Sequence, residues 1–398
     1  MNRYEKRIGQ LREAMQAAGV DAALLTPSGD MEFITGLKRP QREPVETHTF
    51  GDYLQGVLIT RDHIVTIIPY LAHLSVDPQL ANLPWLGDDV IHLPDGDENP
   101  AVGFRPFDGL VGAAAGGSAA GGGATVTVAL PKFALAMTAI KLGARYPSMR
   151  FTCTEDLVSP LRMVKDPDDL DRMRIAARMA DEAFLNVVAK LHHGIHEADV
   201  YHELEWQMRA LGADGTSFST TLLTGRPGLQ AGFAEPAGGP LGKELTAGWV
   251  LAFDFGFLAN GWCSDFGRTV YFGEPTEEMR RAHYLVMEAQ RLGMAAMVGG
   301  RVTAAEVDAA ARDFLVKEGR GHEFIHRLGH SIGVDVHEHP FLCSTDTTVL
   351  QNGMTFTVEP SLWVNHEYFV RVEDVVLVTP DGGVSLNTTP TFDMIVIE

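Results

Sequence analysis

The chain has 398 residues, more than one hydrophobic core usually supports, so two domains are expected. With 45% hydrophobic and 21% charged residues, the composition is that of a globular protein and excludes a disordered one. The formal net charge of −20 at pH 7 disfavours nucleic acid as a partner, because the field of the protein would repel phosphates.

Cysteine usage and the chain start favour a cytoplasmic protein. The three cysteines lie at 153, 263 and 343, too sparse for a disulfide framework or a Cys-x-x-Cys zinc clip. The start, MNRYEKRIGQ, lacks the apolar run of a signal peptide. Residues 109–131 are uncharged but rich in Gly and Ala, so no membrane span is expected, and 112–124 are predicted to form a flexible loop.

Residues 1–160 are predicted to form an α/β domain. Apolar residues at helical spacing from Tyr4 to Met15 predict a helix that ends at Gly19. Helices and strands alternate up to about residue 158, and no motif in this part indicates chemistry. The strands are expected at 22–25, 56–60, 64–68 and 125–130.

Residues 161–398 are predicted to form a second, α+β domain. Asp166 can cap a helix, Pro167 suits its first position, and the apolar pattern that follows ends at Gly194. Further helices are expected at about 200–211, at 277–297, and from Thr303, which begins a capping box. Strand-like segments lie at 249–257, 266–272, 354–364 and 369–379.

A predicted hairpin brings two aspartates together. Its turn signal is Asn-Gly at 260–261, between two apolar runs. A turn centred just before this Asn places Asp254 directly opposite Asp265. Phe253 then faces Phe266 on the other, packed side of the sheet.

The C-terminal strands repeat this arrangement with two glutamates. A turn centred on His366 places Glu359 opposite Glu373, and Arg371 shares the face of Glu373. Like charges opposed on a sheet are destabilising, and either hairpin alone could present them to solvent. Two such hairpins flanked by apolar residues favour buried, converging carboxylates, which need protons or cations. We therefore predict two divalent ions between them.

A nitrogen ligand is available in the segment 326–339, which contains four histidines. Their spacing differs from the HExxH pattern of zinc peptidase helices. Several oxygen ligands with one imidazole suit Mn, Fe, Co or Zn, and all four metals remain open. The histidines are His326, His330, His337 and His339.

Four segments together resemble one protein family: FDFG with SDFGRT, HRLGHSIGVDVHEHP, GMTFTVEPSL and VRVEDVVLVT. They are similar to the pita-bread metallopeptidase family M24, which includes creatinase, prolidase, aminopeptidase P and methionine aminopeptidase. The additional N-terminal domain favours the prolidase and Xaa-Pro aminopeptidase branch. The resemblance implies a creatinase-like α/β domain at 1–160 and an α+β pita-bread catalytic domain at 161–398.

The resemblance also implies the site and its chemistry. Two ions lower the pKa of a bridging water and polarise the scissile carbonyl, and no organic cofactor is expected. The substrate would be a small peptide with an Xaa-Pro bond, and the protein a homodimer. The implied metal ligands are Asp254, Asp265, His330, Glu359 and Glu373.

Four residues receive catalytic roles from the resemblance. Glu359 would be the general base as well as a ligand, and His337 would contact the substrate carbonyl or the tetrahedral intermediate. His326 would line the substrate pocket. Arg371 would hold the site carboxylates or a substrate carboxylate, with an ordinary cross-strand ion pair as the alternative.

Two positions depart from the family pattern. Before FDFG, the branch usually has Pro-His-Ala-x-Pro, whereas this chain has Phe233 in the place of the histidine. Phenylalanine can neither shuttle a proton nor donate a hydrogen bond. Trp262 stands where tyrosine is common in prolidases. The second hypothesis is therefore a related metal enzyme acting on a small non-peptide compound, as a C–N hydrolase or lyase.

Two further hypotheses have less support. The run Gly329-His-Ser-Ile-Gly333 fits the GxSxG motif of serine hydrolases, but no buried strand is expected before Ser331. That hypothesis also leaves the opposed carboxylates unexplained. A binding protein on an inactive scaffold would gain nothing from five intact, costly ligand positions.

Overall fold

The computed structural model describes residues 1–39, 52–95, 100–114, 125–229, 242–390 and 392–398. Phe233 and residues 115–124 of the predicted loop lie outside these ranges. The chain divides into two compact units, Met1–Arg162 and Met163–Glu398. Within the described ranges, no helix combines the length and hydropathy that a membrane crossing requires.

The first unit is an α/β structure around one six-stranded sheet in the order β4-β3-β2-β1-β5-β6. β2 pairs antiparallel with β1 and β3, and the other neighbours are parallel. The strands are β1 Ala22–Leu25, β2 Gly56–Thr60, β3 Ile64–Pro69, β4 Val90–Leu93, β5 Val126–Leu130 and β6 Met149–Cys153. The helices are α1 Arg3–Ala18, α2 Gly29–Thr35, α3 His73–Leu80, α4 Ala101–Ala114, α5 Ala136–Arg145 and α6 Glu155–Met163.

Local signals in the first unit predicted its first elements well. The first helix, α1, ends at Gly19, whose φ of 66° is the left-handed conformation that glycine adopts easily. The predicted loop at 112–124 is wrong at its first three residues, because α4 continues to Ala114. Alanine is the best helix former, which explains the extra turn.

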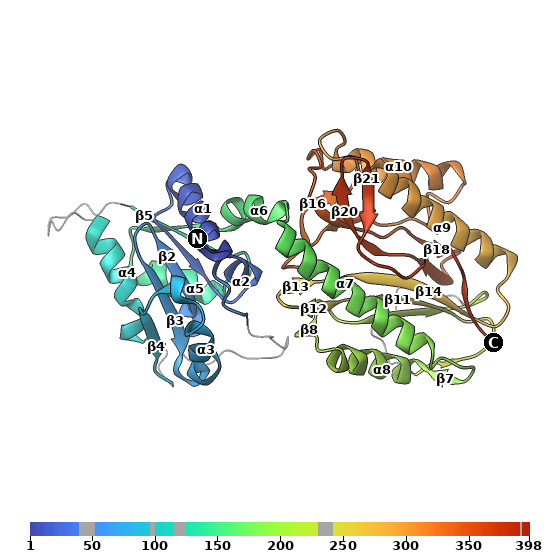
Figure 1. Cartoon of the computed structure of the whole chain (residues 1–398), viewed down its shortest axis with the longest axis horizontal. Coiled ribbons are helices and arrows are strands. Elements are labelled where there is room, and N and C mark those ends of the chain that lie inside the picture. The colour runs from blue at the N-terminus through green and yellow to red at the C-terminus, as the bar shows by residue number, and fades with distance from the viewer. Residues whose placement is uncertain (40–51, 96–99, 115–124, 230–241, 391) are drawn as a thin grey trace. The chain divides into compact units, whose positions relative to one another are not determined.

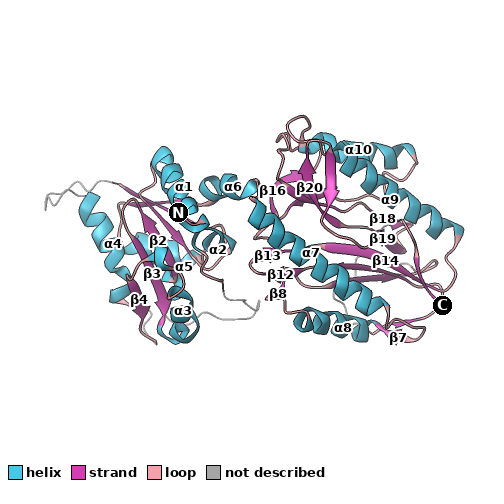
Figure 2. Ribbon diagram, viewed as in Figure 1, coloured by secondary structure: helices cyan, strands magenta, loops and turns pink. Residues whose placement is uncertain are grey.

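The second unit places strands between two pairs of helices, as Figure 1 and Figure 2 show. α7 and α8 share a core with Phe253, Phe255 and Phe266 of the central strands. α9 and α10 pack in a separate core with the C-terminal strands. The helices are α7 Pro167–Val188, α8 Glu197–Ala210, α9 Glu277–Ala296 and α10 Ala304–Lys317.

The principal sheets of the second unit have the orders β22-β14-β11-β9 and β16-β15-β17-β20-β21, and β18 and β19 form a two-stranded ribbon. The central strands are β9 Thr221–Gly225, β11 Val250–Phe255, β12 Phe257–Ala259, β13 Trp262–Cys263, β14 Phe266–Phe272 and β22 Ile395–Ile397. The C-terminal strands are β15 Gly329–Ser331, β16 Glu338–Leu342, β17 Thr355–Val358, β18 Ser361–Val364, β19 Tyr368–Arg371, β20 Asp374–Thr379 and β21 Gly382–Ser385. Short strands complete the unit: β7 Ile195–His196, β8 Gly215–Thr216 and β10 Glu244–Leu245.

The helix starts of the second unit were predicted better than one of its ends. The side chain of Asp166 accepts a hydrogen bond from the backbone of Asp169, and Thr303 forms the capping box with Glu306. α7, however, ends at Val188 and not near Gly194. Leu191, beyond the helix, is 9% exposed and packs in the same core, so the apolar pattern continues after the helix has ended.

Both predicted C-terminal strands are interrupted at an acidic residue. The segment 354–364 breaks between β17 and β18 at Glu359, and Pro360 has no N–H to continue a ladder. The backbone N–H of Glu359 instead donates to the carbonyl of Leu328 at 2.8 Å. The segment 369–379 breaks between β19 and β20 at Glu373, which bridges to Gly267. The two glutamates therefore lie where the strands change partners.

Candidate metal centre

The first acidic hairpin has a different register from the predicted one. Its two-residue turn consists of Asn260 and Gly261, at φ 52° and 81°, the positive values that such a tight turn requires. Asp254 consequently pairs with Gly267, two residues beyond Asp265. A shift of two residues keeps side chains on their faces, so Asp265 still joins the same site. The predicted direct opposition of the aspartates is nevertheless wrong.

The packed side of this hairpin changes in the same way. Phe266 pairs with Phe255, not with Phe253, which lies opposite Arg268. Phe253 and Phe266 are still fully buried in one core. The prediction that these rings form the packed side survives the wrong register because burial depends on the face and not on the partner.

The second acidic hairpin has the predicted register. Val364 pairs with Tyr368, and Ser361 with Arg371, which centres the turn on His366. Val358 pairs with Asp374 in the same register, which places Glu359 across from Glu373. The two glutamates form no ladder pair, because the backbone of Glu373 bonds to Gly267.

Gly267 joins the two hairpins at the site. It pairs with Asp254 on one side and with Glu373 on the other, so these side chains share a face and flank a position without a side chain. A Cβ at Gly267 would lie 3.0 Å from Arg371 Cδ and 3.0 Å from Glu373 Cβ. Glycine therefore keeps open the space in which the carboxylates meet. Gly267 lies in the SDFGRT run, but spacing alone gave it no role.

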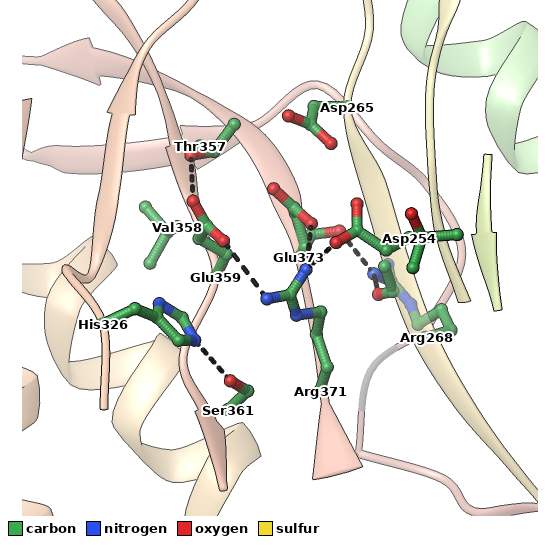
Figure 3. A network of polar contacts seen from close by, with 12 residues as sticks. Asp254, Asp265, Arg268, His326, Thr357, Val358, Glu359, Ser361, Arg371 and Glu373 are labelled. Atoms are coloured by element: carbon green, nitrogen blue, oxygen red, sulfur yellow. Dashed lines mark hydrogen bonds and ion pairs between the residues drawn. The ribbon is translucent and has the colours of Figure 1, made fainter. Parts of the chain in front are cut away.

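Three buried side chains offer ligand atoms that all lie within 4.8 Å of one another: Asp265, His330 and Glu373. His330 Nε2 is 3.5 Å from Asp265 Oδ2 and 3.5 Å from Glu359 Oε1. Figure 3 shows Glu359, Glu373 and Asp254 gathered around Arg371, with Asp265 beside them. All five predicted ligand positions thus converge on one region, from strands far apart in the sequence.

His330 presents a lone pair to this region. Its Nδ1 donates to the carbonyl of Ser331 at 3.1 Å, which fixes the ring and leaves Nε2 directed at the carboxylates. Burial lowers the pKa of His330, so the ring is neutral and Nε2 carries no proton. The backbone N–H of His330 donates to Thr357 Oγ1, which itself donates to Glu359 Oε1 at 3.3 Å.

Without a cation, the ionised form of the buried carboxylates is unfavourable. Burial, followed by the charge of Asp254, raises the pKa of Asp265 well above its usual value. Burial and the neighbouring carboxylates do the same to the pKa of Glu373, and burial raises the pKa of Glu359. Asp265 Oδ1 and Glu373 Oε2 have no hydrogen-bond partner among the described residues. This donor set fits a divalent cation.

Arg371 is engaged by the site carboxylates. Its Nη1 donates to Asp254 Oδ2 and lies 3.8 Å from Glu373 Oε2, and its Nη2 lies 3.7 Å from Glu359 Oε2. Burial opposes the charge of Arg371, but the carboxylates outweigh it and raise the pKa of the guanidinium. Contacts with three acids go beyond the ordinary cross-strand ion pair that was the alternative for this residue.

The remaining predicted histidines lie at the edge of the centre. The exposed ring of His337 lies 4.3 Å from that of His330, centroid to centroid. His326 Nδ1 donates to the carbonyl of Arg327 at 2.7 Å, and Nε2 accepts from Ser361 Oγ (Figure 3). Burial, followed by the charge of Arg371, lowers the pKa of His326 to about 3. These hydrogen bonds connect His326 to Arg327 and Ser361, not to the carboxylates.

A buried polar network behind the centre was missed in the sequence. Arg268 Nη1 donates to the carbonyl of Glu373 at 2.8 Å, and Nη2 to Asp374 Oδ1 at 2.6 Å. Gln290 Nε2 donates to Asp374 Oδ2 at 3.2 Å and to the carbonyl of Val358 at 3.3 Å. The network thus holds the backbone of Glu373 and of the residue before Glu359. Arg268 and Asp374 lie within the recognised motifs, but only the fold pairs them.

The serine-hydrolase hypothesis finds no support in the site. Ser331 lies within β15 and is 0% exposed, whereas a nucleophile elbow presents its serine at a sharp turn before a helix. Trp262, the other departure from the family pattern, pairs with Ala259 next to the turn and is 4% exposed.

Comparisons with known proteins agree with the site. Residues 171–380 match the model of metallopeptidase family M24. The "Probable dipeptidase PepE" of Mycobacterium bovis is 31% identical over 388 residues, covering 97% of this chain and 95% of the relative. The "Xaa-Pro dipeptidase" of Pyrococcus furiosus is 33% identical over 240 residues, covering 60% of this chain and 67% of the relative. Two other curated relatives are matched over 64% and 66% of their own lengths.

Solved structures extend the likeness to the whole fold. The prolidase from Thermococcus sibiricus superposes with a TM-score of 0.83 at 25% identity, covering 100% of both chains. The predicted combination of an α/β unit with a pita-bread unit is thereby confirmed. From the family match over residues 171–380 and the full-length relative, we conclude that this chain belongs to metallopeptidase family M24.

Proposed function

We propose that this protein is a dinuclear metallopeptidase that hydrolyses Xaa-Pro bonds in dipeptides or short peptides. The observation that carries the proposal is the cluster of buried carboxylates with His330 Nε2, in which Asp265 Oδ1 and Glu373 Oε2 have no hydrogen-bond partner in the described part of the chain. The names of the relatives, Xaa-Pro dipeptidase and PepE dipeptidase, support a small peptide as the substrate.

The proposed ligands of the two ions are Asp254, Asp265, His330, Glu359 and Glu373. Asp265, His330 and Glu373 support one ion by their mutual proximity. The second ion relies on Asp254 and Glu359, which contact Arg371 in this structure. When bound, such ions make water nucleophilic near neutral pH and polarise the carbonyl that is attacked, and manganese, cobalt, zinc and iron all suit these donors.

The side chains of the chain supply proton transfer and positioning. Glu359, whose pKa burial raises, is suited to take the proton of the attacking water and return it to the leaving amine. His337, whose exposed ring lies beside His330, would donate a hydrogen bond to the oxyanion that develops. Arg371 keeps Asp254 and Glu359 oriented. His326 is proposed to line the pocket through its bond to Ser361.

A substrate panel with metal analysis tests the proposal. The purified protein, loaded with Mn²⁺, Co²⁺ or Zn²⁺, should hydrolyse Xaa-Pro dipeptides and lose this activity in a chelator. If no Xaa-Pro peptide is cleaved but a small C–N compound is, the second hypothesis replaces the first. Phe233, which suggested that hypothesis, lies outside the described residues.

Homodimerisation stays a prediction, and light scattering of the same sample tests it.

A further inference from the structure

One cation next to the centre has no ionic partner among the described residues. Arg327 is half-buried, forms no side-chain hydrogen bond or ion pair there, and has a buried Nε without a partner. The neighbouring guanidinium groups are engaged: Arg371 with the site carboxylates and Arg268 with Asp374. Arg312 is likewise bonded to Asp308 at 2.7 Å. A half-buried guanidinium without an anion is costly, and its natural partner is a carboxylate from outside.

Contacts place Arg327 on the side of the sheet that carries His330. Phe341 on β16 is the cross-strand partner of His330 on β15, and cross-strand partners share a face. The guanidinium carbon of Arg327 lies 5.2 Å from the centroid of the Phe341 ring.

Aromatic rings lie beside both the metal ligand His330 and this cation. The ring of His337 lies 4.3 Å from His330, and the ring of His339 lies 4.5 Å from Phe341, with both outer histidines exposed. Phe341 itself is half-buried. Since His330 and Phe341 are cross-strand partners, this face runs from the metal ligand past the apolar ring of Phe341 to a positive charge. Such a surface suits a compact apolar group that ends in a carboxylate.

We propose that Arg327 binds the free C-terminal carboxylate of a dipeptide, with Phe341 beside it as the apolar wall of the leaving residue's subsite. This inference rests on the proposed function and makes the enzyme a dipeptidase rather than an aminopeptidase for longer chains. The chain carries a net charge of −20 and its centre is acidic, so an incoming carboxylate needs a local cation. Arginine binds a carboxylate with two parallel hydrogen bonds.

The test compares Ala-Pro with Ala-Pro-amide on the Mn²⁺-loaded enzyme. The wild type should favour the free acid by about ten- to hundred-fold in kcat/KM, the range of a charge-assisted hydrogen-bond pair. Arg327→Gln should lose most of this preference through a higher KM for Ala-Pro, with little change for the amide. Arg327→Lys should restore part of it. Arg301→Gln, which removes the same charge from an exposed position, should behave as the wild type.

The outcomes separate the two proposals. If the wild type cleaves acid and amide equally well, or Arg327→Gln lowers activity on both alike, the carboxylate subsite is overturned and the Xaa-Pro activity stands. An Arg327 that only stacks on Phe341 would give that second result. If the wild type cleaves neither compound, the Xaa-Pro activity itself fails, and the subsite with it. Calorimetric binding of L-proline but not of L-prolinamide, lost in Arg327→Gln, would support the subsite independently of turnover.

Discussion

Glu373 and Asp374 are adjacent, acidic and almost fully buried, at 1% and 3% exposure, yet their surroundings differ completely. Both oxygens of Asp374 have donors, from Arg268 and from Gln290. Glu373 Oε2 has none among the described residues, and the carboxylate of Asp265 raises its pKa further after burial has done so. A buried acid with a complete set of partners holds the fold together, whereas one without them marks a site for a cation.

The largest expected effect is the loss of activity when an acid of the metal centre is changed. Glu359→Gln preserves shape but removes the proton acceptor, so we expect kcat to fall by about 10²- to 10⁴-fold on an Xaa-Pro dipeptide. Steady-state kinetics of the metal-loaded protein measure this, with exposed Glu277→Gln as the control. A variant with more than a tenth of wild-type kcat would show that Glu359 is not the base.

Changing Asp374, the acid with a complete set of partners, should lower the stability of the fold. Asp374→Asn leaves Arg268 as a buried charge without its anion, which should lower the free energy of unfolding by about 3–5 kcal/mol. Glu373→Gln should instead leave the stability of the metal-free protein unchanged or raise it, because it removes a repelled charge. Urea unfolding of both metal-free variants gives the comparison. If both variants lost the same free energy of unfolding, the two adjacent acids would contribute equally to stability, which would contradict the comparison.

Gly267→Ala tests the position between Asp254 and Glu373, the two acids that pair with this glycine. The added methyl would meet Arg371 and Glu373 at 3.0 Å, and overpacking of this kind costs about 1–3 kcal/mol. We expect this cost to appear as weaker metal binding, because Glu373 must move. Gly9→Ala is the matched control, since its Cβ would meet nothing within 4 Å. Unchanged metal affinity in Gly267→Ala would contradict the account of this glycine.

The smallest effect concerns pH. Burial raises the pKa of Asp265, Glu359 and Glu373 in the metal-free fold, so the folded chain binds protons more tightly than the unfolded one. The stability from these groups is present below their unfolded pKa of about 4 and is lost as pH rises through the folded values.

The metal-free protein should therefore lose stability on the order of 1 kcal/mol between mildly acidic and neutral pH, and Glu373→Gln should lose less. Thermal unfolding at several pH values measures the difference. A metal-free wild type whose Tm follows that of Glu373→Gln at every pH would contradict the raised carboxylate pKa values.

Sequence reasoning succeeded where one local signal determined a feature. The caps at Asp166 and Thr303 predicted helix starts, and the period of two along the strands placed the acids on one face. It failed on the register of the first hairpin, because an Asn-Gly turn fixes its own centre and a one-residue error there moves every partner by two. The face was still predicted correctly, since a shift of two residues preserves it.

Features that depend on segments distant in the chain could not be predicted. Gly267 acquires its role only when Glu373 pairs with it from the far end of the chain. The bond between Arg268 and Asp374 and the contact of Arg327 with Phe341 likewise exist only in the folded chain. The break at Glu373 could not be predicted because it depends on the bridge to Gly267, whereas Pro360 directly after Glu359 is a local signal for the end of a strand that was overlooked.

Calorimetric titration of the metal-stripped protein with Mn²⁺ tests the central claim most directly. If the buried acids that lack hydrogen-bond donors exist to hold cations, the wild type should bind two ions per chain. Asp265→Asn or Glu373→Gln should weaken or abolish this binding, while Asp374→Asn retains it. A wild type that binds no ion, or a Glu373→Gln variant that binds as the wild type does, would contradict the claim.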